Sequence, residues 1–194
     1  AGARNSPALS YMVFAPNLHV ELIRGVWAEV GGFFWDGRAE FLVRQPFTPM
    51  TNSSEMNMHD FTHIAEKIKT ASYFPLYKQL FGEPAAYDTQ IVVFNASLCL
   101  ERFEKSYQVN PFTSKFDFYL KGQYTFTEQE KRGMQLFNDS TKAKCALCHL
   151  STPTSYALTD KILFTDYSYD NIGLPKNPSI KSSLTFLRKT PWAR

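Results

Sequence analysis

Three residues of this chain have the types and the spacing needed to bind a haem covalently. Cys145, Cys148 and His149 form the pattern C-x-x-C-H, which is the attachment signature of a c-type haem. Each cysteine thiol adds to one vinyl group of the porphyrin, and the adjacent histidine is the proximal axial ligand of the iron. The motif therefore predicts one covalent haem in this chain and a redox function.

Other uses of a closely spaced cysteine pair fit the sequence less well. A structural zinc site needs four ligands, usually in two pairs, and the only further cysteine is Cys99. The other histidines lie far upstream, at His19, His59 and His63. A thioredoxin-like pair needs a preceding strand, and nothing before Cys145 has a strand pattern. A disulfide across so short a loop would be strained.

A helix that positions this motif can be read from the residues before it. Thr127 and Glu130 form a capping box, which marks the start of a helix, and apolar residues follow at helical spacing up to Phe137. We expect a short amphipathic helix that ends near residues 138–140 and leads to the cysteines. Gly133 inside this helix is either simply tolerated or indicates close packing against another helix or against the haem edge.

Further helices are expected upstream. An apolar stripe over residues 61–71 has the spacing of one helix face, and Pro75 bends or restarts the chain before a stop at Gly82. Another helix begins at Asp88 or Thr89. Its buried face is expected to consist of Ile91, Phe94 and Leu98.

Two smaller features complete the pattern. Cys99 lies on or beside the face just named, so we expect a small buried residue that binds no haem and forms no disulfide. Apolar residues flank Arg24 and Gly25, which indicates a short β-hairpin between His19 and Val30.

Composition bounds the class of protein. The chain has 194 residues, of which 44% are hydrophobic and 20% charged, so it could form one large domain or two small ones. Aromatic residues make up 15%, which suits walls around a flat apolar cofactor or an aromatic-rich core. A net charge of +3 is too small to indicate nucleic-acid binding, and no apolar run is long enough to span a bilayer. Because the chain begins with Ala1, we expect it to be processed or trimmed.

Several stretches beyond the C-x-x-C-H pattern occur in a recognisable order. They are Arg4–Pro7, Phe34–Ala39, Gln45, Glu55–Met56, Phe103–Glu104, Phe116–Gly122, Thr127–Phe137, Phe164–Asp166 and Asn171–Pro175. Together they resemble the bacterial di-haem cytochrome c peroxidase family, which includes MauG-like enzymes. The resemblance spans nearly the whole chain.

The resemblance implies a mainly α, cytochrome c-like fold of two units, of which the first is incomplete. Residues 1–122 would be the remainder of a first, peroxidatic-type domain. Residues 123–194 would be the second domain, with the covalent haem and a truncated C-terminus. Family members carry two haem motifs and this chain has one, so we expect the other upstream of Arg4 and the distal ligand, Met or Tyr, past Arg194. Residues between Pro16 and Gly32 look like an insertion.

The resemblance also implies roles for single residues. His149 would bind the iron of the electron-transfer haem, and Trp35 would relay electrons between the two haems. Gln45 and Glu55 would line the peroxide-binding haem pocket, with Glu55 as the acid–base group. Asn5 would be a calcium ligand. Without the family, Trp35 could equally be a core residue and Glu55 an ordinary surface acid.

The function that the resemblance implies is electron transfer within a di-haem peroxidase that reduces hydrogen peroxide. Its cofactor would be haem c, with a second haem in the complete protein, and its electron donor a small cytochrome c or cupredoxin. Two alternatives remain: a MauG-like oxidase that acts on a protein partner, and a non-enzymatic mono-haem carrier or subunit of a cytochrome assembly. We expect a periplasmic or extracellular protein, because this haem attachment occurs outside the bacterial cytoplasm. It would be either a homodimer or part of a larger assembly.

Overall fold

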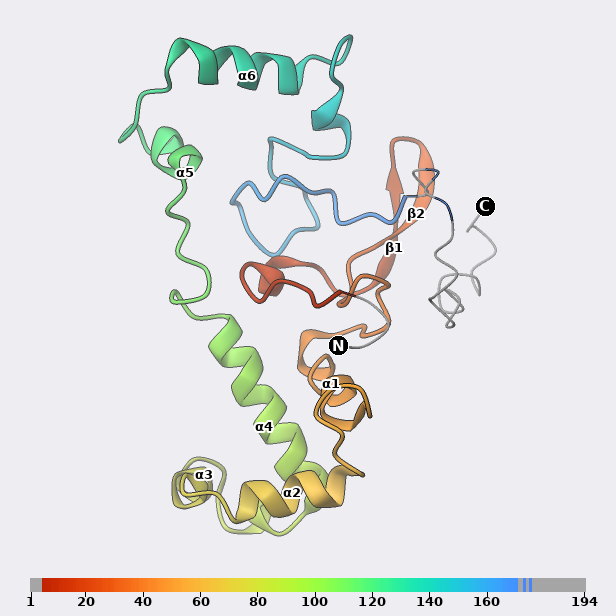
Figure 1. Cartoon of the computed structure of the whole chain (residues 1–194), viewed down its shortest axis with the longest axis vertical. Coiled ribbons are helices and arrows are strands. Elements are labelled where there is room, and N and C mark those ends of the chain that lie inside the picture. Colours follow the sequence, from red (N-terminus) through yellow and green to blue (C-terminus); the bar gives the residue numbers. More distant parts are fainter. Residues whose placement is uncertain (1–4, 171–172, 174, 176–194) are drawn as a thin grey trace.

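The computed structural model describes residues 5–170 together with residues 173 and 175. Most of its regular elements are helices joined by long connecting segments (Figure 1), so the expected helix-rich fold is confirmed. Residues 1–4 and most of 171–194, including Arg4 and Asn171 of the family-like stretches, lie outside the described residues. The helices are α1 (Phe47–Thr51), α2 (Phe61–Lys69), α3 (Phe74–Phe81), α4 (Thr89–Glu104), α5 (Lys115–Leu120) and α6 (Glu128–Asn138).

The expected hairpin is present and consists of the antiparallel strands β1 (His19–Ile23) and β2 (Val26–Val30). Its two-residue turn has positive φ at both positions, 50° at Arg24 and 80° at Gly25. These values are typical of a type I′ turn, whose twist matches that of the flanking strands. Gly31 directly after β2 also has positive φ, and a Cβ there would lie 2.3 Å from the carbonyl oxygen of Pro16. The chain can therefore leave the hairpin along this path only with a glycine.

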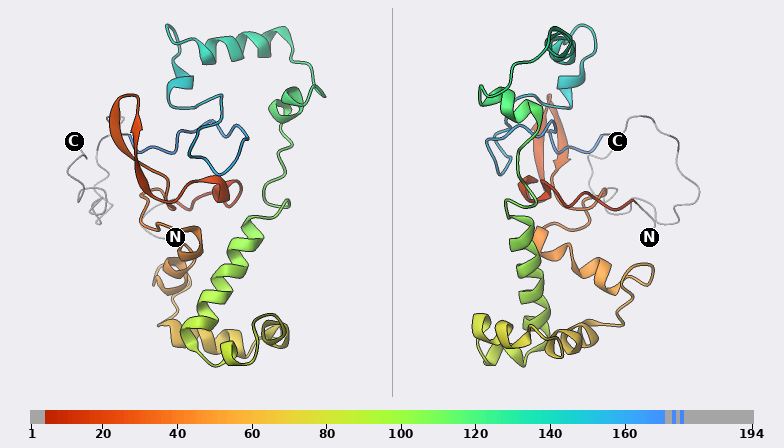
Figure 2. Two further views of the ribbon diagram at one scale, coloured as in Figure 1. Left: turned by 180° about the vertical axis from the view of Figure 1, so that it is seen from behind. Right: turned by 60° about the vertical axis from the view of Figure 1, so that its left-hand side comes forward.

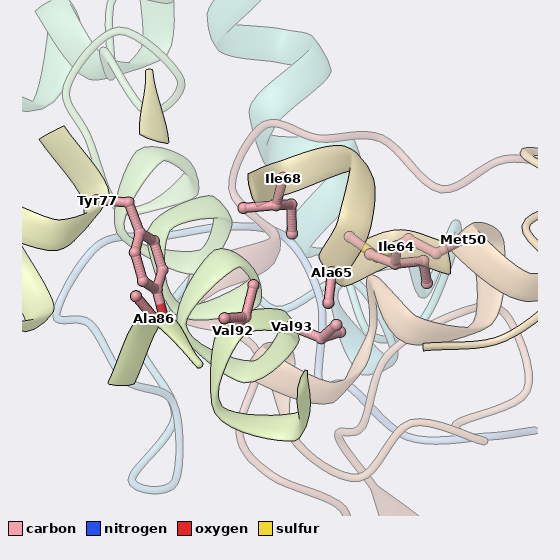
Figure 3. Packing of buried hydrophobic residues seen from close by; sticks show 8 residues of the cluster. All are labelled: Met50, Ile64, Ala65, Ile68, Tyr77, Ala86, Val92 and Val93. Carbon is pink, nitrogen blue, oxygen red and sulfur yellow. The ribbon is translucent and has the colours of Figure 1, made fainter. Parts of the chain in front are cut away.

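The main hydrophobic core lies where α1, α2, α3 and α4 meet (Figure 3). Asp60 caps α2 by accepting the backbone N–H of His63, and Asp88 caps α4 by accepting that of Ile91. Both caps satisfy amides that a helix leaves unpaired at its first turn. The buried residues of this cluster are Met50, Ile64, Ala65, Ile68, Tyr77, Ala86, Val92 and Val93.

The expected buried face of α4 was wrong. Ile91 and Phe94 are 44% and 47% exposed, and the buried positions on this helix are Val92, Val93 and Ser97. Residues 91–94 are all apolar, so the sequence offers two overlapping stripes. Only the position of α2, which packs against α4, decides which stripe is covered.

The two ends of the molecule are packed differently. A second buried cluster lies close to the hairpin and is formed by Val13, Ala15, Phe33, Phe34, Ala39 and Leu42. By contrast, α5 and α6 contain no buried residue. Figure 2 shows α4 running from the end with α2 and α3 toward the end with α5 and α6. The helices that lead to the haem motif therefore have apolar surface that the described chain leaves uncovered.

Two matched substitutions test the corrected face of α4. Ile64→Ala removes a buried side chain and should lower the free energy of unfolding by about 2–5 kcal/mol. Ile91→Ala removes an exposed one and should change it by less than about 0.5 kcal/mol. Urea denaturation of this chain measures both, and equal losses would show that Ile91 is buried after all.

Candidate haem-binding site

The C-x-x-C-H motif is folded as one compact turn. Residues Cys145–Leu147 form a 3₁₀ turn, and the backbone N–H of His149 donates to the carbonyl oxygen of Cys145 at 2.9 Å. In such a turn residues i and i+3 lie on the same side, which favours the approach of both cysteines to one porphyrin. Both thiols are free, as covalent attachment to a porphyrin requires.

The turn is reached from α6, as the sequence predicted. Thr127 accepts the backbone N–H of Glu130, and the Glu130 carboxylate accepts that of Thr127, which completes the capping box. The backbone hydrogen bond from Thr127 is the first cause that lowers the pKa of Glu130, to about 2. The helix ends at Asn138, and Lys144 directly before the motif has a φ of 55°. This left-handed residue turns the chain into the haem-binding turn.

His149 is held in the orientation and tautomer that an iron ligand needs. Its Nδ1 lies 3.0 Å from the carbonyl oxygen of Phe164. Because a carbonyl only accepts, this hydrogen bond places the proton on Nδ1 and leaves the lone pair of Nε2 for a metal. Histidine ligands commonly bind their second nitrogen to a carbonyl in this way, which makes the ligand more basic. His149 is exposed.

Aromatic and aliphatic side chains surround the turn without covering it. The ring of Phe164 contacts Phe116 of α5 at 4.9 Å and Phe137 of α6 at 5.6 Å between centroids. Leu136 and Leu147 nearby are 43% and 47% exposed. A Cβ at Gly133 would meet nothing within 4 Å, so the expected packing of another helix against this glycine is absent in the described chain. Two free thiols, a prepared imidazole and open apolar surface fit a haem.

The hairpin reaches this turn through Arg24. Its Nη1 donates to the carbonyl oxygen of Leu147 at 2.7 Å and to Cys148 Sγ at 2.9 Å. Its Nη2 donates to Asp170 Oδ2 at 3.0 Å and lies 3.5 Å from Asp166 Oδ2. The sequence predicted the hairpin but not this contact, because nothing local to residues 19–30 indicates a partner more than a hundred residues away.

Tyrosines bind the segment after the motif to the hairpin. Tyr169 Oη donates to the carbonyl oxygen of Gly31 at 2.7 Å, and Tyr156 Oη donates to that of Asp166 at 3.0 Å. Burial raises the pKa of Tyr167 and of Tyr169 to about 12. Tyr169 uses its proton in the hydrogen bond to Gly31, whereas the buried Tyr167 hydroxyl has no hydrogen-bond partner within the described chain.

The upstream candidates are not gathered into one site by contacts within the described chain. Trp35 is 61% exposed, Gln45 is half-buried, and Glu55 and Asn5 are exposed. No hydrogen bond or ring contact of the described residues joins Trp35, Gln45 and Glu55. Their catalytic roles, and that of Asn5 toward calcium, stay predictions.

The structure also contains a large apolar cavity that the sequence did not predict. Its volume is about 530 Å³, and it opens between α2, α3 and α4. Its lining includes Met56, directly after Glu55, and also Cys99, which is exposed rather than buried as expected. The reason is the rotated face of α4, which turns Cys99 and Leu100 toward the cavity. The lining residues on the other helices include Ile64, Ile68, Leu76, Tyr77, Leu80 and Phe81.

Comparison with known proteins decides the family. A sequence model described as di-haem cytochrome c peroxidase matches residues 1–125. The chain belongs to the di-haem cytochrome c peroxidase family. It is 32% identical to the methylamine utilization protein MauG of Paracoccus denitrificans over 183 residues, which cover 94% of this chain and 45% of that protein. It is also 32% identical to a cytochrome c551 peroxidase of Pseudomonas aeruginosa, over 76% of this chain and 36% of that one.

A solved structure agrees with this assignment. The diheme peroxidase BthA of Burkholderia thailandensis matches with a TM-score of 0.78 and 29% identity, over 93% of this chain and 43% of that chain. The chain therefore spans less than half the length of each of these three relatives. A second sequence model, described as DNA-binding protein VF530, matches residues 171–194, which are almost entirely outside the described residues.

The exposure of Cys99 gives a direct test of the cavity. In the haem-bearing protein Cys145 and Cys148 are used, so a thiol reagent should label one cysteine rapidly without denaturant. Cys99→Ser should abolish this labelling and leave haem content unchanged. If Cys99 is labelled only after the protein unfolds, it is buried, as the sequence predicted, and does not line an open cavity.

Proposed function

We propose that this chain is the electron-transfer part of a di-haem cytochrome c peroxidase. The observation that carries the proposal is the imidazole of His149, fixed by Phe164 beside two free thiols, in a chain of this family. A bound haem supplies an iron that accepts and donates one electron. Cys145 and Cys148 would hold the porphyrin, and His149 would bind the iron from the proximal side.

Each neighbouring group of the chain then has a defined task. The Phe164 carbonyl keeps the imidazole oriented and its Nδ1 protonated, which strengthens the Nε2 ligand. The apolar rings of Phe116 on α5 and Phe137 on α6 would contact the porphyrin and exclude water from it, which would help to set its potential. Since none of these helices has a buried residue of its own, we infer that the haem supplies the missing core of this half.

The domain boundary near Gly122 belongs to the same proposal. The match to the family model ends at residue 125, and both buried clusters lie within residues 13–93. Residues 1–122 would then be the remainder of the first, peroxidatic-type domain, and residues 123–194 the second domain. The 530 Å³ cavity would be part of the pocket for the first haem.

In the complete protein, the first domain would carry the peroxide chemistry. Trp35 would pass electrons from the haem on His149, and its 61% exposure leaves it accessible to a cofactor. Glu55 would move a proton between the peroxide oxygens while Gln45 holds them by hydrogen bonds. Asn5 would contribute an oxygen ligand to calcium at the domain interface.

A MauG-like oxidase is the second candidate. The match to MauG of Paracoccus denitrificans covers 94% of this chain, against 76% for the cytochrome c551 peroxidase, at the same identity. In that case the electrons would come from a protein partner rather than from a small cytochrome c or cupredoxin. A mono-haem carrier or subunit is the third candidate. None of the described helices is long and apolar enough to cross a membrane. For all three candidates we propose a periplasmic or extracellular location, because this type of haem attachment occurs outside the bacterial cytoplasm.

Haem staining after denaturing electrophoresis tests the attachment site. The chain should carry one covalent haem, and Cys145→Ala or Cys148→Ala should reduce the stain strongly because one thioether is lost. His149→Ala should prevent normal maturation because it removes the proximal ligand. Cys99→Ala is the matched control and should stain like the parent chain. Full staining of the double variant Cys145→Ala/Cys148→Ala would contradict the assignment.

Peroxide turnover tests the division of labour between the domains. This chain alone should be a poor peroxidase, because reduction of peroxide needs an open iron with an acid–base group beside it. A longer form with the upstream haem should turn over rapidly, and Glu55→Gln in that form should lower kcat by about 10²–10⁴-fold. Equal, rapid turnover in the short and long forms would show that the second haem is dispensable.

A further inference from the structure

One guanidinium joins the haem-binding turn to the segment that anchors its histidine. Arg24, at the tip of the hairpin, donates to the carbonyl oxygen of Leu147 and to Cys148 Sγ on one side. On the other side it donates to Asp170 and lies within 3.5 Å of Asp166. These partners are 123 to 146 residues away in sequence, so the contact exists only through the tertiary fold.

The carboxylate of Asp166 depends on this guanidinium. Asp166 is buried, and its Oδ1 accepts the backbone N–H and the hydroxyl of Ser168 at 3.0 and 2.8 Å. Its Oδ2 is buried and accepts no hydrogen bond within the described chain. The ion pair with Arg24 therefore compensates a buried negative charge that would otherwise be costly.

The backbone at the hairpin tip is adapted to this contact. Arg24 has a φ of 50°, a left-handed conformation that costs a non-glycine residue about 1–2 kcal/mol. Asparagine, aspartate or glycine is the usual residue at this position of a type I′ turn. The contacts of the Arg24 side chain offset the cost of its backbone conformation. This indicates that residue 24 is an arginine because of its side-chain contacts and not because of its turn conformation.

We propose that Arg24 is a positioning residue for the proximal side of the haem and raises the reduction potential of its iron. Phe164, whose carbonyl holds His149 Nδ1, lies two residues before Asp166. Arg24 thus binds both the haem-binding turn and the segment around Asp166, and the imidazole of His149 is held between these two segments. This inference rests on the proposed haem attachment and adds a residue that the resemblance does not assign.

The direction of the effect follows from the charges at the site. A cation close to a haem favours the reduced iron, which is the less positive state, while carboxylates favour the oxidised iron. Removing the charge of Arg24 leaves Asp166 and Asp170 without their cation. The oxidised state should then gain stability and the potential should fall. Removing the carboxylate of Asp170 alone should have the opposite effect.

Spectroelectrochemical titration of the haem-bearing protein tests this. Arg24→Gln should lower the midpoint potential by about 59 mV, which is a tenfold change in a one-electron equilibrium constant. Arg24→Lys keeps the charge and should stay closer to the parent value. Asp170→Asn, at an exposed carboxylate, should raise the potential. Arg102→Gln on α4 removes an exposed cation away from the turn and is the matched control with no shift.

The outcomes separate this inference from the proposed function. A parent chain without covalent haem would overturn the proposed function and this inference with it. Haem-bearing variants whose potentials equal the parent value, or Arg24→Gln and Asp170→Asn variants that shift in the same direction, would overturn only the role of Arg24. If Arg24→Gln fails to mature, the sign of the Asp170→Asn shift decides.

Discussion

The hydrogen bond between His149 Nδ1 and the Phe164 carbonyl is the contact on which the proposed haem-binding half depends. It needs residues 145–149 and residue 164 to approach within 3.0 Å. The backbone bends sharply on both sides to allow this, since Lys144, Phe164 and Tyr167 all have left-handed φ values. Such residues persist only where the surrounding contacts hold them, and they commonly occur at functional sites.

Some of those surrounding contacts come from the hairpin. Val30 of β2 forms an isolated bridge with Ser168, and the backbone N–H of Gly31 donates to the carbonyl oxygen of Tyr167 at 2.9 Å. Arg24 completes the link from the hairpin tip. An element early in the chain therefore supports the later segment that orients His149, the proposed haem ligand. The helical core of α1–α4 makes no contact of this kind to the turn among the hydrogen bonds of the described residues, and the apolar cavity between α2, α3 and α4 stays open beside it.

Features set by neighbouring residues were predictable from the sequence. The capping box at Thr127 and Glu130, the start of α4 after Asp88 and the hairpin turn at Arg24 and Gly25 are all local patterns. The hydrophobic pattern could not show which side of α4 is buried. Residues 91–94 are all apolar, so two different faces of the helix each begin with apolar residues. Cys99 was misplaced for the same reason. The Arg24 contact and the cavity depend on approaches between distant segments, which periodicity does not encode.

The central claim is that the haem is held by the turn that starts at Cys145, and peptide mapping of the native protein tests it most directly. Trypsin cleaves after Lys144 and Lys161 and should release residues 145–161 as one peptide. Mass spectrometry should find this peptide with the mass of one haem added and with no free thiol at Cys145 or Cys148. An unmodified peptide from a protein that still contains haem iron would contradict the claim.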